Sequence, residues 1–214
     1  MKHKKGLYER LIKVPQDVIL ALAALILLSP ILLVLAILVR TKLGSPIIFK
    51  QERAGKDGKP FYMYKFRSMS DARDENGQLL PDEQRLGKFG KVLRSTSLDE
   101  LPSLWNVVNT SCSLCGPRAL YLKYIPRYSG HQARRLEVRP GITGLAQVSG
   151  RNAISWEDKF NFDVQYVDHI TFIGDWKIML KTVEKVLKRE GISSATSVTM
   201  EEFMGSDREM VSHE

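Results

Sequence analysis

Two neighbouring acidic residues, Asp99 and Glu100, are the residues of this 214-residue chain best suited to chemistry. They stand near the start of a segment, residues 98–108, whose apolar residues recur with helical spacing. The positive end of a helix dipole favours the ionised form of a carboxylate in the first turn, and such a carboxylate can bind a hard divalent cation. Asp99 could therefore act as a nucleophile or as a metal ligand. Adjacent helical side chains point about 100° apart, so the two carboxylates would have different roles.

Ser97 and Glu100 also match a capping box, in which the side chain of each residue binds the backbone amide of the other. In that interpretation Glu100 stabilises the start of a helix and has no chemical role. The local sequence leaves the structural and the functional interpretation open.

Basic residues on both sides of the acidic pair could hold phosphate groups. Arginine offers a planar fork to phosphate oxygens, and glycine lets backbone amides approach them. Such clusters, seen alone, are more often solvated surfaces or patches for lipid headgroups. The residues considered include the Gly-rich segment 139–151 and the side chains of Lys88, Lys91, Arg94, Arg118, Arg139 and Arg151.

Membrane contact is expected from residues 18–39, a run of 22 residues in which only Ser29 and Pro30 are neither strongly apolar nor alanine. A straight helix of this length would reach roughly 33 Å, enough for a bilayer core of about 30 Å. The run is too long for a secretory signal peptide and lacks a following small-residue cleavage site.

The flanks of this run do not orient it, because residues 1–17 and residues 40–56 each contain five Lys or Arg residues. One solution places both flanks on the cytoplasmic side, with a turn at Ser29 and Pro30. Pro30 removes a backbone donor and clashes with the carbonyl of Ile26, and the Ser29 hydroxyl can satisfy part of the freed groups. The other solution is a spanning helix with a proline kink, and physical reasoning leaves both open.

The remaining chain predicts an α/β domain that is mostly helical with short strands. Residues 46–51 and 60–66 are expected to be strands, separated by a turn-rich segment at 54–58. Helical spacing predicts helices at 156–167 and 175–189. Their apolar stripes favour a protein core, although a basic helix beside an anchor could also lie on a membrane. The stripes are Trp156, Phe160, Val164 and Val167, then Trp176, Met179, Val183 and Val186.

Composition excludes several classes of protein. With 43% hydrophobic and 26% charged residues, collagen-like and wholly disordered chains are ruled out. The net charge of +8 is uneven, because residues 191–214 carry five acidic residues against Arg208 alone. A basic body followed by an acidic tail indicates contact with phosphates and a solvated tail. Two cysteines, Cys112 and Cys115, cannot form a disulfide scaffold, and they are expected to pack as small apolar side chains, without a redox or zinc role.

In their order and spacing, five motifs of the chain resemble the signatures of bacterial sugar transferases, specifically the monotopic phosphoglycosyl transferases. The resemblance runs from the apolar segment to about residue 190, and it is nearest to the small, minimal members of bacillosamine type. The motifs are SPIIFKQER at 45–53, YKFRSM at 64–69, SLDELPSLWNV at 97–107, GPR at 116–118 and RPGITGLAQVSGR at 139–151.

The resemblance implies a two-step reaction. The aspartate of the Asp-Glu pair, here Asp99, would accept a phosphosugar from a UDP-sugar with release of UMP, and a polyprenol phosphate would then take the phosphosugar. Mg²⁺ would bridge the Asp99 carboxylate and the diphosphate. Glu100 would position the metal or manage a proton. Phosphate or nucleotide contacts would come from Arg118 and Arg151, and with less assurance from Lys65, Arg67, Arg94 and Arg139.

The resemblance also implies an architecture. Residues 1–42 would form a basic N-terminus and a re-entrant membrane helix broken at Ser29 and Pro30, and residues 43–190 a cytosolic catalytic domain with interfacial amphipathic helices. Residues 191–214 would be a flexible acidic tail. The expected location is the cytoplasmic face of the bacterial plasma membrane, with a UDP-sugar, undecaprenyl phosphate and phospholipid as partners. A homodimer is left open.

The chain departs from the family pattern behind the acidic pair. Related chains commonly read Gly-Asp-Met-Ser and Gly-Pro-Arg-Pro, where this one has TSCS at 110–113 and Ala119 after the arginine. These changes put the local loop geometry in question without altering Asp99 or Glu100. A different class of function is a membrane-anchored basic protein that binds anionic lipid or nucleic acid. No recognisable nucleic-acid module supports it, and nucleic acid is not expected as a partner.

Overall fold

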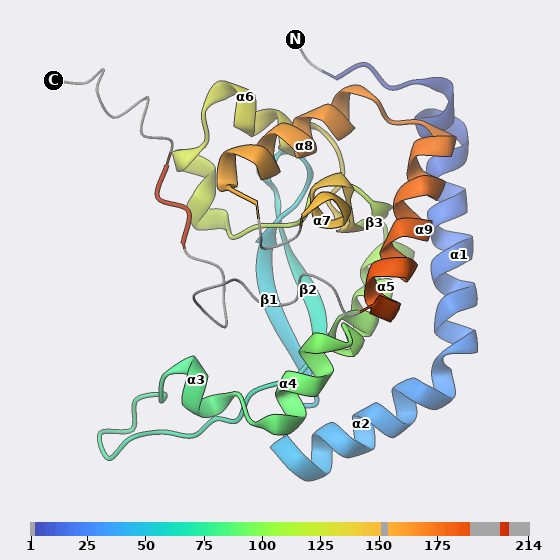
Figure 1. Ribbon diagram of the computed structural model, residues 1–214. Coiled ribbons are helices and arrows are strands. Elements are labelled where there is room, and N and C mark those ends of the chain that lie inside the picture. The colour runs from blue at the N-terminus through green and yellow to red at the C-terminus, as the bar shows by residue number, and fades with distance from the viewer. Residues whose placement is uncertain (1–2, 151–153, 189–201, 206–214) are drawn as a thin grey trace, which may run out of the picture.

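The computed structural model describes residues 3–150, 154–188 and 202–205. A bent pair of helices runs along one side of a body that contains two small sheets and several short helices (Figure 1). The described part confirms the α/β prediction of a mostly helical chain with short strands.

The helix pair begins with a π-helical turn, η1 (Tyr8–Ile12), and continues as α1 (Lys13–Leu27) and α2 (Ser29–Leu43). The two arms are bent by 65° at the predicted break. The Ser29 hydroxyl donates a 2.8 Å hydrogen bond to the carbonyl of Ile26, which lies in the turn disrupted by Pro30. Among the described residues no single helix has the length and apolar composition of a membrane span, whereas the bent pair meets these criteria jointly.

One face of the helix pair packs on the body and the other is exposed. Ala21 of α1 and Leu35 and Val39 of α2 are buried in two of the hydrophobic cores. The opposite side presents a row of exposed apolar side chains, a pattern unfavourable in water and suited to lipid. These side chains are Ile19, Leu22, Ile26, Leu27, Ile31, Leu33, Val34 and Ile37.

Two buried ionic groups attach the start of the helix pair to the body. Lys13 contacts Asp175, which lies in the last helix of the domain. Asp17 accepts hydrogen bonds from the hydroxyl of Ser113 at 2.6 Å and from Arg139 at 3.4 Å. Because an unpaired buried charge is costly, these contacts fix where α1 leaves the body.

The predicted hairpin is present. Strands β1 (Ile48–Ala54) and β2 (Pro60–Phe66) are antiparallel, with Ile48 opposite Phe66, and the turn η2 (Lys56–Gly58) joins them. The prediction for β2 is confirmed. The prediction for β1 was three residues short at its end, because Glu52 and Arg53, poor strand formers by composition, pair with Tyr62 and Phe61 of β2.

A second sheet was not predicted from the sequence. Strands β3 (Ser113–Cys115) and β4 (Gly141–Thr143) form a short parallel pair. A Cβ atom on Gly141 would lie 2.1 Å from the amide nitrogen of Gly116, and one on Gly144 would lie 2.1 Å from the carbonyl oxygen of Gly116. The glycines of this segment thus allow close backbone packing, and their contact with a phosphate stays a prediction.

The helices and turns of the body surround these sheets (Figure 1). Helix α8 confirms the prediction for 156–167, and α9 begins three residues before its predicted start. Their bounds are α3 (Asp82–Arg85), α4 (Lys88–Ser95), η3 (Leu98–Ser103), α5 (Leu104–Val108), η4 (Leu122–Arg127), α6 (Gly130–Ala133), η5 (Arg134–Glu137), α7 (Leu145–Ser149), α8 (Trp156–Asp168) and α9 (Phe172–Lys188).

The two predicted apolar stripes have different surroundings. In α8, Phe160, Val164 and Val167 are buried, as expected for core residues. In α9 the core interpretation was wrong for Trp176 and Val183, whose side chains are 38% and 57% exposed. Asp175 and Ile178 of α9 face the body instead, because the buried Asp175 pairs with Lys13 and sets the rotation of the helix. The exposed apolar face of α9 also includes Phe172, Ile173, Leu180 and Leu187.

Asn106 of α5 joins that helix to β2. Its side chain is buried, its Oδ1 accepts a 3.0 Å hydrogen bond from the amide of Tyr64, and its Nδ2 donates to the carbonyl of Tyr62 at 2.8 Å and to Ser111 Oγ at 3.1 Å. One amide group therefore satisfies two backbone groups of a strand. This contact fixes the segment 98–108 against β2.

We expect Asn106→Ala to lower the free energy of unfolding by about 2–4 kcal/mol, because two backbone groups of β2 each lose a buried partner. Urea unfolding in detergent, followed by circular dichroism, measures the change. Asn76→Ala, in an exposed loop, is the control and should shift the value by about 0.5 kcal/mol or less. Equal stability of the two variants would contradict the role assigned to Asn106.

Candidate active site

Asp99 and Glu100 lie in the first turn of η3, and the capping-box interpretation was wrong. Ser97 has φ of 57°, in the left-handed region, and its side chain makes no capping hydrogen bond. The carbonyl of Ser97 accepts from the amide of Glu100 at 3.1 Å. The Glu100 carboxylate points to basic side chains because charged donors bind it more strongly than a backbone amide. The chain does have a capping box, at Ser129 and Gln132 before α6.

The carboxylate of Glu100 is bound by two cations. Lys65 Nζ of β2 and Arg118 Nη2 each lie 2.6 Å from Glu100 Oε1. Burial raises the pKa of Glu100, but the charges and hydrogen bonds of Arg118 and Lys65 outweigh burial and hold this pKa well below its usual range. Glu100 is therefore ionised at every physiological pH.

Asp99 has a different environment. Its side chain is 7% exposed, and burial, followed by the charge of Glu100, raises the pKa of Asp99 to about 6. Lys65, Arg94 and Arg118 oppose the shift. Among the described residues, none donates a hydrogen bond to its carboxylate. At neutral pH Asp99 is thus a mostly ionised carboxylate that is poorly solvated, which suits a nucleophile.

Three of the predicted phosphate-binding residues meet at the acidic pair. Lys65 and Arg118 contact Glu100, and Arg94 acts on Asp99 while its Nε donates to Ser68 Oγ at 3.0 Å. The backbone of Arg118 is itself fixed, because Arg135 donates to its carbonyl at 2.5 Å and is held by Asp163. The buried Arg135–Asp163 ion pair therefore positions Arg118 for its contact with Glu100.

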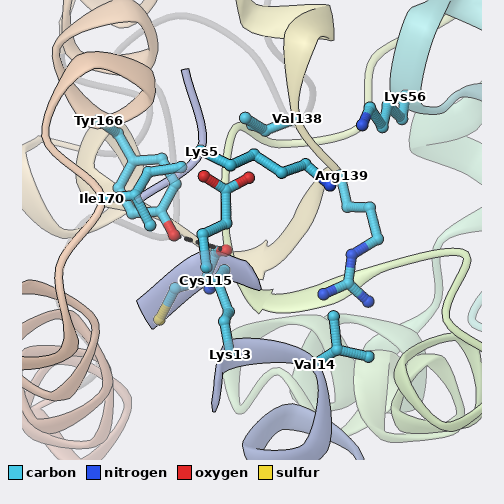
Figure 2. A pocket seen from close by; sticks show the side chains of 10 residues that line it. Lys5, Lys13, Val14, Lys56, Cys115, Val138, Arg139, Tyr166 and Ile170 are labelled. Atoms are coloured by element: carbon cyan, nitrogen blue, oxygen red, sulfur yellow. Dashed lines mark hydrogen bonds between the residues drawn. The ribbon is translucent and has the colours of Figure 1, made fainter. Parts of the chain in front are cut away.

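Two other predicted phosphate-binding residues, Arg67 and Arg139, have contacts away from the pair. Arg67 is buried and donates to the carbonyls of Ser45 and Met69. Figure 2 shows Arg139 at a cavity of about 90 Å³ beside the first turns of α1, together with Lys5 and Lys13. This cavity belongs to the contact between α1 and the body. Arg151 lies outside the described residues.

Three residues near the groups that bind the pair were not identified from the sequence: Arg53, Tyr121 and Lys159. The guanidinium of Arg53 lies 3.8 Å from the ring centre of Tyr121, and burial and the charge of Arg118 lower its pKa, while Glu100 raises it. Burial and Arg118 also lower the pKa of Lys159, to about 8. Arg53 is the last residue of the first family-like motif, and this position could have indicated its role. Lys159 on α8 lies outside these motifs, and nothing in the neighbouring sequence indicated its place near the site.

The acidic pair fits a magnesium ion better than a metal held by protein alone. The described residues contain no group of three or more His, Cys, Asp or Glu side chains that could hold a metal. Mg²⁺ usually takes one or two carboxylates together with substrate phosphates and water. Asp99, with a carboxylate free of protein donors in the described part and next to Glu100, matches that donor set.

The segment behind the pair accommodates its departures from the family pattern. Thr110, which stands where the family-like pattern has glycine, has φ of 62°, in the left-handed region that favours glycine. Ser111 Oγ accepts from Asn106 and is tied to Asn109, so a neutral side chain fills the position of the expected acid. Cys112 and Cys115 are free and buried, and burial raises the pKa of both thiols, which confirms their packing role.

Comparison with known proteins gives one family. Residues 8–189 match the model of the family described as "Bacterial sugar transferase". "Uncharacterized sugar transferase EpsL" of Bacillus subtilis (strain 168) is 54% identical over 190 residues, covering 89% of this chain and 94% of that protein. "UDP-galactose-lipid carrier transferase" of Erwinia amylovora is 38% identical over 199 residues. "UDP-glucose:undecaprenyl-phosphate glucose-1-phosphate transferase" of Klebsiella pneumoniae is 40% identical over 181 residues.

The last two relatives are longer proteins, and the aligned part covers 42% and 39% of their lengths. Their names do not bear on the expected bacillosamine-type subtype, which stays a prediction. The match over residues 8–189 includes the bent helix pair and every residue assembled around Asp99 and Glu100. The chain belongs to the bacterial sugar transferase family.

Proposed function

We propose that this protein transfers a sugar 1-phosphate from a UDP-sugar to undecaprenyl phosphate, as the name of the Klebsiella pneumoniae relative describes for that protein with glucose. The observation that carries the proposal is the pairing of a buried, weakly solvated Asp99 with a Glu100 held by Lys65 and Arg118. A basic protein that only bound anionic lipid or nucleic acid would have no use for this arrangement, which engages two of its cations internally.

Asp99 is the nucleophile in this proposal. A carboxylate oxygen attacks the phosphorus that bears the sugar, the bond from this phosphorus to the bridging oxygen breaks, and UMP leaves with that oxygen. In the second step an oxygen of undecaprenyl phosphate attacks the same phosphorus, and the Asp99 carboxylate is released. Each step forms one P–O bond and breaks one, and splitting the transfer lets the two substrates bind in turn.

The surrounding cations reduce the repulsion between an anionic nucleophile and an anionic substrate. Arg94 and Arg118 act on Asp99 electrostatically. Arg118 in turn acts on Arg53 and Lys159, and we place these two cations along the approach of the diphosphate. Such preorganised charges act strongly in a site with little water. Asp99 would also hold Mg²⁺, which supplies further charge neutralisation at the diphosphate. Glu100 keeps Lys65 and Arg118 in place and remains ionised throughout.

The helix pair suits a lipid substrate. We propose that α1 and α2 enter and leave the membrane on the cytoplasmic face, supported by the 65° bend, the exposed apolar rows and the equal number of Lys and Arg residues in both flanks. The exposed apolar face of α9 would lie at the membrane surface beside them. The acidic pair would then be held at the level where a lipid phosphate waits and where a soluble donor can reach it.

The donor sugar is expected to be N-acetylated, following the resemblance to bacillosamine-type enzymes. Relatives are named for galactose and glucose, so the contacts that select the sugar must be tested directly. A UMP-release assay with a panel of UDP-sugars and undecaprenyl phosphate, in nanodiscs with and without magnesium, tests the reaction class and the donor together.

Replacing the nucleophile should stop the first step. We expect Asp99→Asn and Asp99→Ala to lower UMP release by at least about a thousandfold and to abolish a trapped adduct with labelled donor, because the adjacent carboxylate of Glu100 is bound by Lys65 and Arg118. Mass spectrometry of the adduct and the UMP assay measure both effects. Glu75→Gln, in an exposed loop, should behave as wild type. Product formation without any adduct on residue 99 would refute the covalent mechanism.

The charge of Lys159 should appear in the pH profile. Because its pKa is about 8, it loses its positive charge as the pH rises through this value, and the donor kcat/KM should fall by up to tenfold per pH unit above it. Steady-state UMP release from pH 6 to 10 tests this. Lys159→Arg should keep the rate high to a higher pH, and an unchanged profile in that variant would exclude Lys159 as the titrating group.

Cysteine labelling should place both ends of the helix pair on one side. The native cysteines are buried, so single cysteines at Lys5 and Ser45 can be detected separately with a membrane-impermeant maleimide. We expect both to be protected in intact spheroplasts and labelled in inverted vesicles. Protection of one position and labelling of the other would show a spanning helix.

A further inference from the structure

A short segment of the acidic tail packs on an aromatic cluster of the body. Residues 202–205 are described, and Phe203 is 3% exposed. Its ring packs against four others from η4, from the start of α8 and from the residue after η4. The ring centres lie 4.9 Å from Phe160, 5.5 Å from Trp156, 5.9 Å from Tyr124 and 6.0 Å from Tyr128. The expectation of a flexible tail was therefore wrong for this segment, because burial of an aromatic ring offsets the entropy of ordering it.

Two cations of η4 hold the segment in register. Lys123 Nζ lies 2.6 Å from Glu202 Oε2, and Arg127 Nη1 lies 2.8 Å from Glu202 Oε1 and donates to the carbonyl of Phe203 at 2.5 Å. These ion pairs are partly exposed, and exposed ion pairs contribute little compared with the burial of a phenyl ring. Burial of Phe203 thus contributes most of the free energy that holds the segment on the body, and the ion pairs of Glu202 fix its position along η4. In Figure 1 this segment, drawn in red, lies beside the part of the body that contains η4.

The aromatic cluster around Phe203 leads to the acidic pair by two routes. On one side, Lys159 Nζ lies 5.2 Å from the ring centre of Trp156, and the charge of Arg118 lowers the pKa of Lys159. On the other side Tyr124 packs edge-on against Tyr121 at 5.7 Å, and Tyr121 stacks with Arg53. Phe203 therefore contacts the two rings, Trp156 and Tyr124, that support the cations of the donor site.

The segment is an addition to the family-like part of the chain. The family match ends at residue 189, whereas Glu202 and Phe203 follow it. Four aromatic rings of the matched part, Tyr124, Tyr128, Trp156 and Phe160, are covered by a side chain from outside it.

We propose that Glu202 and Phe203 form a clasp that fixes the aromatic wall next to the acidic pair, so that Lys159 and Arg53 are held for the diphosphate of the donor. The inference rests on the proposed function. Both residues act through Trp156 and Tyr124 and do not touch the reacting atoms, so they are positioning residues for the first half-reaction. The lipid phosphate attacks after UMP has left and depends less on this wall.

In a ping-pong reaction each substrate has its own kcat/KM. A general loss of folding lowers both constants, whereas loss of the clasp should lower the constant for the UDP-sugar alone. We expect Phe203→Ala to lower kcat/KM for the UDP-sugar about tenfold and to leave kcat/KM for undecaprenyl phosphate within about twofold. Phe203→Leu, which keeps an apolar side chain, should lie between Phe203→Ala and wild type. Met204→Ala, at a neighbouring side chain that is 68% exposed, is the matched control and should be unchanged.

Glu202→Ala provides a second variant that keeps the aromatic cluster intact, should Phe203→Ala fail to fold. It should lower the donor kcat/KM about two- to threefold, with the acceptor constant unchanged. If a variant changed kcat/KM for both substrates equally, or for neither, the clasp would be overturned. The proposed function would still stand, because it depends on turnover by the wild-type protein. Absence of UMP release from wild type with every UDP-sugar would overturn the proposed function and the clasp with it.

Discussion

The ion pairs of Glu100 with Lys65 and Arg118 are the interaction on which the rest of the site depends. Two adjacent carboxylates repel each other, and without these cations the charge on Glu100 would raise the pKa of Asp99 further. With them, one carboxylate is permanently ionised and the other is poised near neutrality. The division of roles between the two acids is therefore set by their surroundings, since their chemistry is nearly the same.

Several remote parts of the chain serve this one arrangement. Lys65 comes from β2, which is fixed to the helical segment of the acidic pair by Asn106. Arg118 depends on the buried pair of Arg135 and Asp163, which belongs to η5 and α8. The bent pair of α1 and α2 is attached to the body by Lys13 and Asp175. The proposed transfer reaction thus needs a rigid body that is held by buried polar contacts. Each of these contacts has a free-energy cost, because its charged groups lose their hydration.

The sequence identified the acidic pair, the helix break and the hairpin, because each has a local signal: adjacent carboxylates, a Ser-Pro step within an apolar run, and β-branched segments around a glycine turn. It failed where long-range contacts decide. Ser97 looked like a cap, but two distant cations attract Glu100 more strongly than a backbone amide does. The rotation of α9 follows from the partner of Asp175, and Lys159 joins the site only through the packing of α8, so neither had a signal in the nearby residues.

Asn106 also has a consequence for the geometry of the acidic pair. Its short side chain spans the gap between α5 and the strand that carries Lys65. An amide on a side chain longer by one carbon would push α5 outward, by up to about 1.5 Å, to make the same bonds. The length of the Asn106 side chain thus sets the distance between the acidic pair and Lys65. A change in that length would alter the position of the Asp99 carboxylate relative to Lys65.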